Sequence, residues 1–489
     1  MVSEIFEGVP APSSSLGHWL PKDRAHIQKW LTKKLAQLDQ SNKKRSLTLD
    51  PSIIAMQQLV GGNPTLSRLS VSMFTEVPPA YANDPTGQPQ VRNFDVMLRL
   101  VNMIIQEGPQ FYDVTDPPTA MGMLGFPINA ILDWPMGTLS GYTFFLDPQV
   151  NNKWQVILNT WGKYLKTADS AACLSQENGW LSTDALNILT AKGNDGTTTY
   201  TFQQLYACNP SLPNFGFASW DDFFTRKFNP GVRPVAYPDN QPTASQPDPS
   251  LVIDNACESA PLQIVTNVKL NDCFWLKQQP YSLANMLDND PFTSQFVGGS
   301  VYQAFLSSIS YHCWHAPVSG RVAGVRVVPG TYYSENLYQG FLDPSGPDPS
   351  ASNNSQPYIS AVATRGIIFI QADNPIIGLM AIVFIGMAEV SSCEFVVKTG
   401  DKVTKGDMIG MFHFGGSSHC MVFRPSTNLQ PYNFVLPPPW TNDPNNSAVC
   451  SALAVVTKSS TNGQSTNGHS SNGHPANGNS TNGHSTNGS

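Results

Sequence analysis

The stretch Arg321-Val-Ala-Gly-Val-Arg-Val-Val-Pro-Gly330 sets the pattern for the second half of the chain. Similar short apolar runs, bounded by Gly, Pro or Asp, recur at Ile367-Ile-Phe-Ile370 and Leu379-Met-Ala-Ile-Val-Phe-Ile385. Runs of this length with turn residues between them are typical of β-strands that follow one another in the sequence. We therefore expect a mainly antiparallel, β-rich body over residues 216–456.

The chain before about residue 215 has the period of helices. Apolar residues share one helical face in segments 27–38, 94–101 and 154–165, and Asn93 is placed to cap the second segment. Six prolines between residues 228 and 250 disfavour regular structure and mark a connection. The sequence therefore predicts an α+β fold, with a helical N-terminal region over 1–215 and the β-rich catalytic domain over 216–456.

The last 33 residues, 457–489, repeat Asn-Gly every five positions and have no apolar face. Such a segment buries too little surface to offset the entropy of ordering it, so we expect a disordered tail. The tail contains His469, His474 and His484. A metal-binding role for them is conceivable, but polar repeats are more often solvated spacers, and we expect no metal site.

Composition excludes several kinds of partner. Hydrophobic residues make up 40% of the chain, which supports a sizeable core, while the net charge of −7 and the lack of a long basic run argue against nucleic acid. The N-terminus resembles neither a signal peptide nor a transit peptide. The longest apolar stretch, residues 376–388, is shorter than the roughly 20 residues of a membrane span. We expect a cytoplasmic protein without a membrane anchor.

The cysteines favour neither a disulfide framework nor a zinc site. Eight are scattered along the chain and none forms a C-x-x-C pair. We expect most of them to be reduced, buried and apolar in character.

The chemistry is concentrated around Gly415-Gly-Ser-Ser418. Standing alone, this segment is typical of a flexible turn. It is accompanied by Tyr311-His-Cys-Trp-His-Ala-Pro-Val-Ser-Gly320, with two histidines three apart, and by Asn255-Ala-Cys-Glu258. A serine hydroxyl needs a neighbouring base, and a neutral imidazole needs an acceptor that fixes its tautomer. Because glycine lacks a Cβ, the carbonyl before Ser417 can be approached closely by that hydroxyl.

These motifs, with Phe217-Ala-Ser-Trp-Asp-Asp-Phe-Phe-Thr-Arg226 and Gly400-Asp-Lys-Val-Thr-Lys-Gly-Asp-Met-Ile-Gly410, resemble the phosphatidylserine decarboxylase family. The likeness covers roughly residues 150–425 and is strongest to the soluble fungal branch of L-tryptophan decarboxylases. In combination, the motifs are highly specific.

The resemblance implies a pyruvoyl enzyme made by self-cleavage. Ser417 would attack the carbonyl of Gly416 and form an ester, and β-elimination and hydrolysis would then leave a pyruvoyl group and release ammonia. The β chain would end at Gly416, and a 73-residue α chain would begin at the former Ser417 and remain associated with it. The covalent ketone condenses with a substrate amine and accepts electrons as carbon dioxide leaves, so no added cofactor is needed.

The resemblance also assigns roles to individual residues. His315 would be the base that activates Ser417, and His312 would donate a proton after carbon dioxide departs. His413, close to the glycines, is more typical of a structural residue. The family's aspartate falls on Cys257 or, with a one-residue slip, on Glu258, and we expect Glu258 to orient His315.

Asp254 is held in reserve for that orienting role. Four aromatic residues are possible pocket residues or simply core: Trp275, Trp314, Tyr332 and Tyr333.

The sequence leaves several functions open. The first is decarboxylation of an aromatic L-amino acid, L-tryptophan or a relative, in fungal specialised metabolism. The second is decarboxylation of phosphatidylserine to phosphatidylethanolamine, which the expected lack of an anchor disfavours. The third is a binding protein on the same scaffold that no longer cleaves. A lipoyl or biotin carrier ranks last, because the hairpin tip lacks a lysine.

Overall fold

The computed structural model describes residues 24–44, 46–78, 91, 93–111, 127–241, 247–272, 280–341, 354–389, 392–414, 417–438 and 446–457. The described residues up to Val456 form one compact unit that contains both helices and sheets. The division expected at residue 215 therefore falls inside this unit. The Asn-Gly repeats and their histidines lie outside the described residues, so the predicted disorder of the tail stays a prediction.

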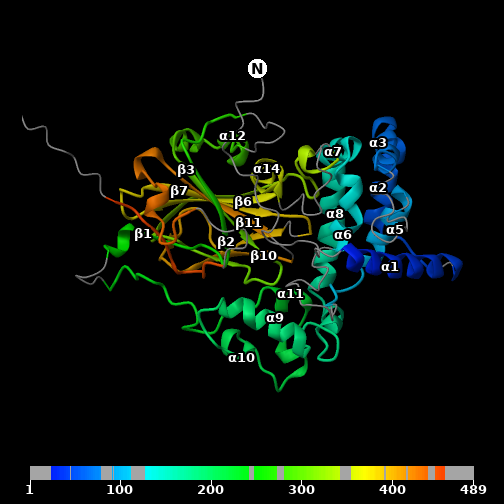
Figure 1. Ribbon diagram of the computed structural model, residues 1–489, viewed down its shortest axis with the longest axis horizontal. Helices are drawn as coiled ribbons and strands as arrows, with labels where there is room; N and C mark the ends of the chain where they lie inside the picture. Colours follow the sequence, from blue (N-terminus) through cyan, green and yellow to red (C-terminus); the bar gives the residue numbers. More distant parts are fainter. Residues whose placement is uncertain are drawn as a thin grey trace, which may run out of the picture. The chain divides into compact units, whose positions relative to one another are not determined.

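The N-terminal region is helical, as its periodicity predicts. Its helices are α1 (Arg24–Lys44), α2 (Pro51–Gly62), α3 (Pro64–Thr75), α5 (Phe94–Ile104), α6 (Pro127–Met136), α7 (Leu139–Leu146), α8 (Pro148–Leu165), α9 (Thr183–Asn194), α10 (Phe202–Leu205) and α11 (Trp220–Phe224). Asn93 caps α5 by accepting a hydrogen bond from Val96 N at 3.0 Å. Figure 1 shows α7 and α8 between the strands and the pair α2 and α3, which contact α8 and α7 respectively.

The β body follows as predicted, and every ladder in it is antiparallel. Its strands are β1 (Val252–Asp254), β2 (Ala260–Thr266), β3 (Ser300–Leu306), β4 (Cys313–His315), β5 (Gly320–Val328), β6 (Arg365–Ala372), β7 (Leu379–Gly386), β8 (Ser392–Phe395), β9 (Lys402–Val403), β10 (Met408–His413), β11 (Ser417–Phe423) and β12 (Ala452–Val455). A seven-stranded sheet has the order β2-β3-β11-β7-β6-β5-β9, a three-stranded sheet has the order β4-β10-β8, and β1 pairs with β12. Short helices α12 (Leu283–Met286) and α14 (Gln356–Val362) lie in the connections. The predicted α+β class is confirmed.

Both faces of the large sheet are buried, and β7 shows how. Its residues Leu379, Ala381, Val383 and Ile385 belong to the cluster that includes the N-terminal helices, which we call the helix-side core. The alternate residues Met380, Ile382 and Phe384 join Trp314 and Phe412 of the small sheet in a second cluster, the sheet-side core. Because successive side chains of a strand point to opposite faces, a strand covered on both sides reads as one continuous apolar run. The apolar stretch at 376–388 is thus a buried strand region, as predicted.

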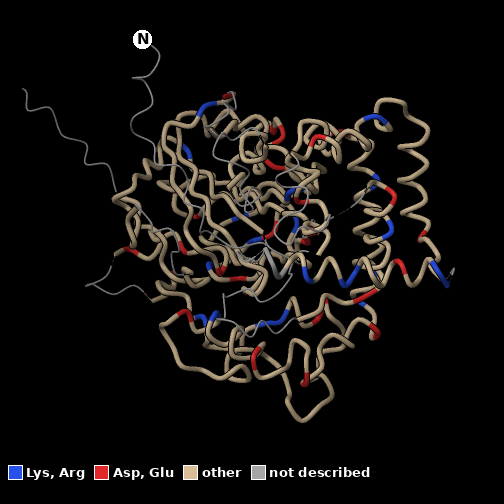
Figure 2. Tube along the Cα trace, turned by 45° about the vertical axis from the view of Figure 1, so that its right-hand side comes forward, with Lys and Arg blue, Asp and Glu red and all other residues tan. Residues whose placement is uncertain are grey.

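Carboxylates make the expected tight turns before β10. Asp401 Oδ2 accepts a hydrogen bond from Lys398 N at 2.9 Å, and Asp407 Oδ2 accepts one from Thr404 N at 2.7 Å. The seven described cysteines are free thiols, and Cys273 lies outside the described residues. Within the described ranges no helix is both long and apolar enough to cross a membrane. Acidic and basic positions are interspersed along the chain (Figure 2).

Candidate active site

Ser417 is the first residue of a central strand. In β11 it lies between Leu306 of β3 and Gly386 of β7. Its side chain is buried, and among the described residues its Oγ has no hydrogen-bond partner. Gly415 and Gly416, which precede it, lie outside the described residues, so the predicted cleavage bond is described only on its serine side.

The two adjacent serines differ in their surroundings. Ser418 points to the opposite face of β11, where its Oγ donates to Ala304 O at 3.0 Å and accepts from Gln303 Nε2 at 3.0 Å. A buried hydroxyl without a partner costs free energy, so such groups are rare and often functional. Ser417 has this property and Ser418 does not; that Ser417 is the reacting serine stays a prediction.

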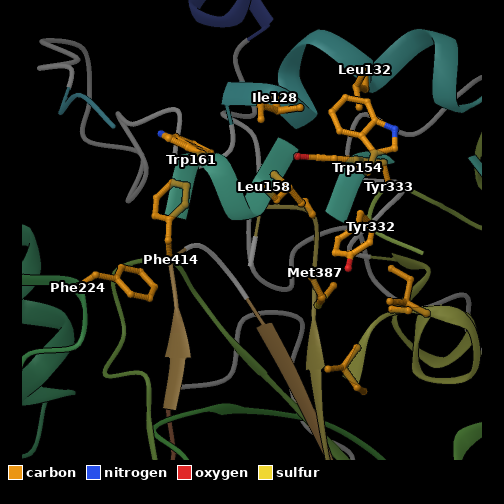
Figure 3. Close-up of a cluster of buried hydrophobic side chains, with 14 of the residues drawn as sticks. Ile128, Leu132, Trp154, Leu158, Trp161, Phe224, Tyr332, Tyr333, Met387 and Phe414 are labelled. Atoms are coloured by element: carbon orange, nitrogen blue, oxygen red, sulfur yellow. The ribbon is translucent and has the colours of Figure 1, made fainter. Parts of the chain in front are cut away.

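The backbone is strained on the approach to this serine. Phe414 has a φ of 54°, in the left-handed region that bulky residues seldom adopt. Its ring packs edge-to-face against Trp161 of α8, with 4.8 Å between ring centroids, and against Phe224 of α11 at 5.8 Å (Figure 3). Tertiary packing therefore holds an unfavourable conformation three residues before Ser417, as is common at functional sites.

The register of β4 and β10 places the two histidines at different positions along β10. Phe412 N donates to His312 O at 3.0 Å, whereas His315 pairs with Met408. Since β10 runs toward Ser417, His312 lies beside the end of the strand nearest the junction, and His315 lies about four residues, on the order of 13 Å, further back. The His312 ring is buried and stacks on Phe224 at 4.3 Å.

The tautomer of His315 is set by a backbone carbonyl. Its Nδ1 lies 2.7 Å from Gly406 O, which can only accept, so Nδ1 carries the proton. Its Nε2 lies 3.1 Å from Tyr311 Oη and can then accept from that hydroxyl. Burial lowers the pKa of His315 below its ordinary value, which favours the neutral ring. The imidazole thus has the form of a base, but in this arrangement it makes no hydrogen bond to Ser417 Oγ.

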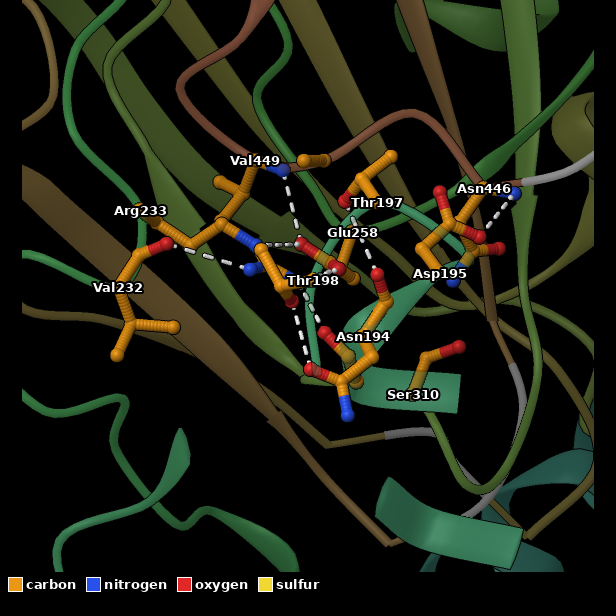
Figure 4. A network of polar contacts seen from close by, with 12 residues as sticks. Asn194, Asp195, Thr197, Thr198, Val232, Arg233, Glu258, Ser310, Asn446 and Val449 are labelled. Carbon is orange, nitrogen blue, oxygen red and sulfur yellow. Dashed lines mark hydrogen bonds and ion pairs between the residues drawn. The ribbon is translucent and has the colours of Figure 1, made fainter. Parts of the chain in front are cut away.

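Glu258 does not orient His315 directly, and this corrects the sequence-based expectation. Its carboxylate forms a two-point ion pair with Arg233, at 2.5 Å and 3.0 Å, and accepts from Val449 N at 2.9 Å (Figure 4). Arg233 also donates to Gly193 O at 2.6 Å. The carboxylate is therefore engaged by the Pro-rich connection and the C-terminal segment, and it reaches His315 only through its charge.

The other residues of segment 254–258 lie nearer β4, the strand that carries His315. Asp254 N donates to Pro317 O at 3.0 Å and His315 N donates to Ala256 O at 2.9 Å, so the two segments run side by side. Both carboxylate oxygens of Asp254 lack a partner among the described residues, and burial raises its pKa to about 7. Cys257 is buried, and burial raises the pKa of its thiol.

Sequence reasoning missed two polar residues near the junction. His419 shares a strand face with Ser417, and burial lowers its pKa to about 3, so it stays neutral. Glu389 lies three residues after Gly386, and burial raises its pKa to about 8. Strand period could have placed His419 beside Ser417, whereas no local signal marks Glu389. His413 bridges Asp221 and Glu394 at 2.8 Å each, consistent with its predicted structural role.

The suggested pocket aromatics are mostly core. Trp314 stacks on Phe384 with ring centroids 3.8 Å apart, within the sheet-side core. Tyr332 and Tyr333 lie beside Met387 in the helix-side core (Figure 3). Trp275 lies outside the described residues. Across the described ranges no group of three or more His, Cys, Asp or Glu side chains could hold a metal ion.

The site is thus a buried serine, without a hydrogen-bond partner among the described residues, that follows a Gly-Gly pair at the start of a central antiparallel strand. Comparison with known proteins identifies the family. Two family models described as phosphatidylserine decarboxylase match residues 50–189 and 220–435. The chain therefore belongs to the phosphatidylserine decarboxylase family and is a decarboxylase, that is, a carboxy-lyase. Enzymes of this family are made as proenzymes and depend on a pyruvoyl group.

Three fungal decarboxylases illustrate the similarity. The chain is 42% identical to decarboxylase iboD of Amanita muscaria over 62% of this chain and 84% of that protein. It is 32% identical to the L-tryptophan decarboxylase of Psilocybe cubensis over 85% of this chain and 90% of that protein. It is 27% identical to phosphatidylserine decarboxylase proenzyme 3 of Schizosaccharomyces pombe over 44% of this chain and 20% of that protein.

Proposed function

We propose that this decarboxylase cleaves itself between Gly416 and Ser417 and converts an aromatic L-amino acid, L-tryptophan or a relative, to its amine and carbon dioxide. The observation that carries the proposal is the buried Ser417 hydroxyl, which has no partner among the described residues and follows a strained Phe414. A hydroxyl that is not held by a hydrogen bond is free to turn toward the preceding peptide.

The residues at the junction fit a pyruvoyl group formed from Ser417. When formed, that group supplies a ketone that takes up a substrate amine and accepts the electrons released with carbon dioxide. His312, beside the end of β10, is our candidate for holding the proton that the product carbon receives. His315 is neutral, and its Nε2 lone pair faces the Tyr311 hydroxyl; it remains our candidate for the base that activates Ser417.

The substrate assignment draws on the relatives. Proteins named decarboxylase or L-tryptophan decarboxylase match 62% and 85% of this chain, whereas two phosphatidylserine decarboxylases match 44% and 43% of it. The alternative substrate is phosphatidylserine, since the catalytic chemistry would be the same. A non-cleaving binding protein is the third candidate, and the retained Ser417, His312 and His315 argue against it.

Intact mass spectrometry tests the processing. We expect two chains from the wild type, the shorter with 73 residues and a blocked N-terminus, and one uncut chain from Ser417→Ala. An active wild-type sample that consists of a single full-length chain would exclude pyruvoyl formation and with it the proposed mechanism.

Carbon dioxide release tests the substrate. Processed protein is supplied in parallel with free L-tryptophan, L-phenylalanine and liposomes that contain phosphatidylserine. We expect release from an aromatic amino acid and little from the liposomes. The reverse result would favour the lipid alternative while leaving the self-cleavage intact.

A further inference from the structure

A cleft opens between α8 and the end of β10. It has a volume of about 290 Å³, and Leu158, Trp161 and Leu165 of α8, with Phe414, form its apolar wall. Figure 3 shows Trp161 and Phe414 facing each other, with Leu158 beside them. Lys163 and Lys166 lie at its exposed rim. Polar side chains complete the lining: Asn159, Asp221, Glu389, Ser392 and His413. Small-molecule sites combine an apolar surface with polar groups that orient the ligand.

Opposite α8, the cleft is lined by two residues that lie close to Ser417, namely Phe414 and Glu389. Phe414 precedes Ser417 by three residues, a distance of at most about 11 Å along the chain. Glu389, also in the wall, follows Gly386 by three residues, and Gly386 is the cross-strand partner of Ser417. Phe414 and Glu389 thus place the cleft within a few residues of Ser417, along the chain on one side and across the β7–β11 pair on the other.

Glu389 is the unusual member of this wall. Its side chain is only 5% exposed, and one oxygen, Oε1, accepts from Ile128 N at 2.7 Å and Asn129 N at 3.0 Å at the start of α6. The other oxygen, Oε2, has no partner among the described residues. The preceding Ala388 has a φ of 54°, so the turn that presents Glu389 is itself strained.

Capping of α6 gives hydrogen bonds to only one of the two carboxylate oxygens of Glu389. A buried acceptor in an apolar cleft costs free energy unless a donor reaches it. Burial raises the pKa of Glu389 to about 8, although backbone N–H groups, including those of Ile128 and Asn129, act in the opposite direction. The missing contact is a hydrogen-bond donor that arrives with a ligand.

We propose that this cleft receives the side chain of the substrate and that Glu389 Oε2 accepts a hydrogen bond from a ring N–H. The inference rests on the proposed decarboxylation of an aromatic amino acid and specifies how that substrate is chosen. An indole ring would lie against the edge of the Trp161–Phe414 pair, whose rings contact each other with centroids 4.8 Å apart, and supply the donor. A phenyl ring would fill the same space and leave Oε2 unpaired, so Glu389 favours indole-bearing substrates.

The test compares kcat/KM for L-tryptophan and L-phenylalanine in the wild type and in Glu389→Gln. The amide oxygen of the variant can still cap α6, which turns its NH2 group toward the cleft, where a donor would meet a donor. We expect kcat/KM for L-tryptophan to fall roughly ten- to a hundredfold and that for L-phenylalanine to change less than about threefold.

A matched control separates recognition from folding. Glu76→Gln alters another carboxylate that accepts from a helix start, at Ser140 N of α7, but lies outside the cleft wall. We expect it to keep the wild-type preference, and gel electrophoresis is used to check that every variant is completely processed. An equal loss with both substrates, or no loss with either, would overturn the role of Glu389 alone. A wild type inactive on every aromatic amino acid would overturn the proposed substrate and this inference together.

Discussion

Glu258 and Glu389 are both buried carboxylates, yet their surroundings differ in kind. Glu258 has a two-point partner in Arg233 and a backbone donor in Val449, so its oxygens are satisfied (Figure 4). Glu389 has donors on one oxygen only, and near it Ser417 has none among the described residues. Saturated buried groups fix a fold, whereas unsatisfied ones are retained where a reaction or ligand needs them. The comparison assigns structure to the Glu258 network and chemistry to the junction.

The two serines give the largest expected contrast. Ser417→Ala removes the only hydroxyl that can attack Gly416, so we expect no cleavage even after days at 25 °C. Ser418→Ala removes a hydroxyl that already has two partners, and we expect cleavage to proceed at a cost of about 1 kcal/mol in stability. Gel electrophoresis over time measures both. Cleavage in Ser417→Ala would place the reacting group elsewhere.

The two histidines should separate processing from turnover. We expect His315→Ala to slow cleavage, while His312→Ala still cleaves but turns over about 10²- to 10⁴-fold more slowly. The register of β4 and β10 places His312 nearer the junction than His315, so an exchange of the two roles is the alternative to test. If His312→Ala blocks cleavage and His315→Ala does not, the base is His312.

The Glu258 network should matter for stability rather than chemistry. Glu258→Gln leaves Arg233 buried without a counter-charge, which typically costs about 3–5 kcal/mol. Denaturant unfolding should show this loss, and Arg233→Met combined with Glu258→Gln should recover part of it. A stable Glu258→Gln protein that fails to cleave would return Glu258 to the catalytic role.

Sequence patterns predicted what depends on local periodicity. The continuous apolar run of β7, the helical face of α8 and the Asn93 cap are properties of neighbouring residues, so they could be read directly. Ser417 became the candidate for the reacting serine because its motif resembles that of the family. The partner of Glu258 could not be found, since Arg233 comes from a Pro-rich connection without periodicity.

The cleft was equally out of reach of the sequence. Its wall combines α8, the turn after β7 and the end of β10, and only the folded chain brings them together. The apolar residues that line it read in the sequence simply as core, and the carboxylate reads as the polar end of a strand.

The last expected effect is the pH dependence of stability set by Glu389. Its folded pKa of about 8 lies above the ordinary value of 4.5, so the folded state holds a proton more tightly than the unfolded state. The resulting stability is fully present below about pH 4.5 and is lost as pH rises through about 8. Glu389→Gln cannot ionise, so its melting temperature should gain on the wild type between pH 5 and pH 9. If the melting temperatures of the wild type and Glu389→Gln change with pH in the same way, a donor already satisfies Oε2 in the resting protein. Glu389 would then no longer differ from Glu258 in its hydrogen bonding.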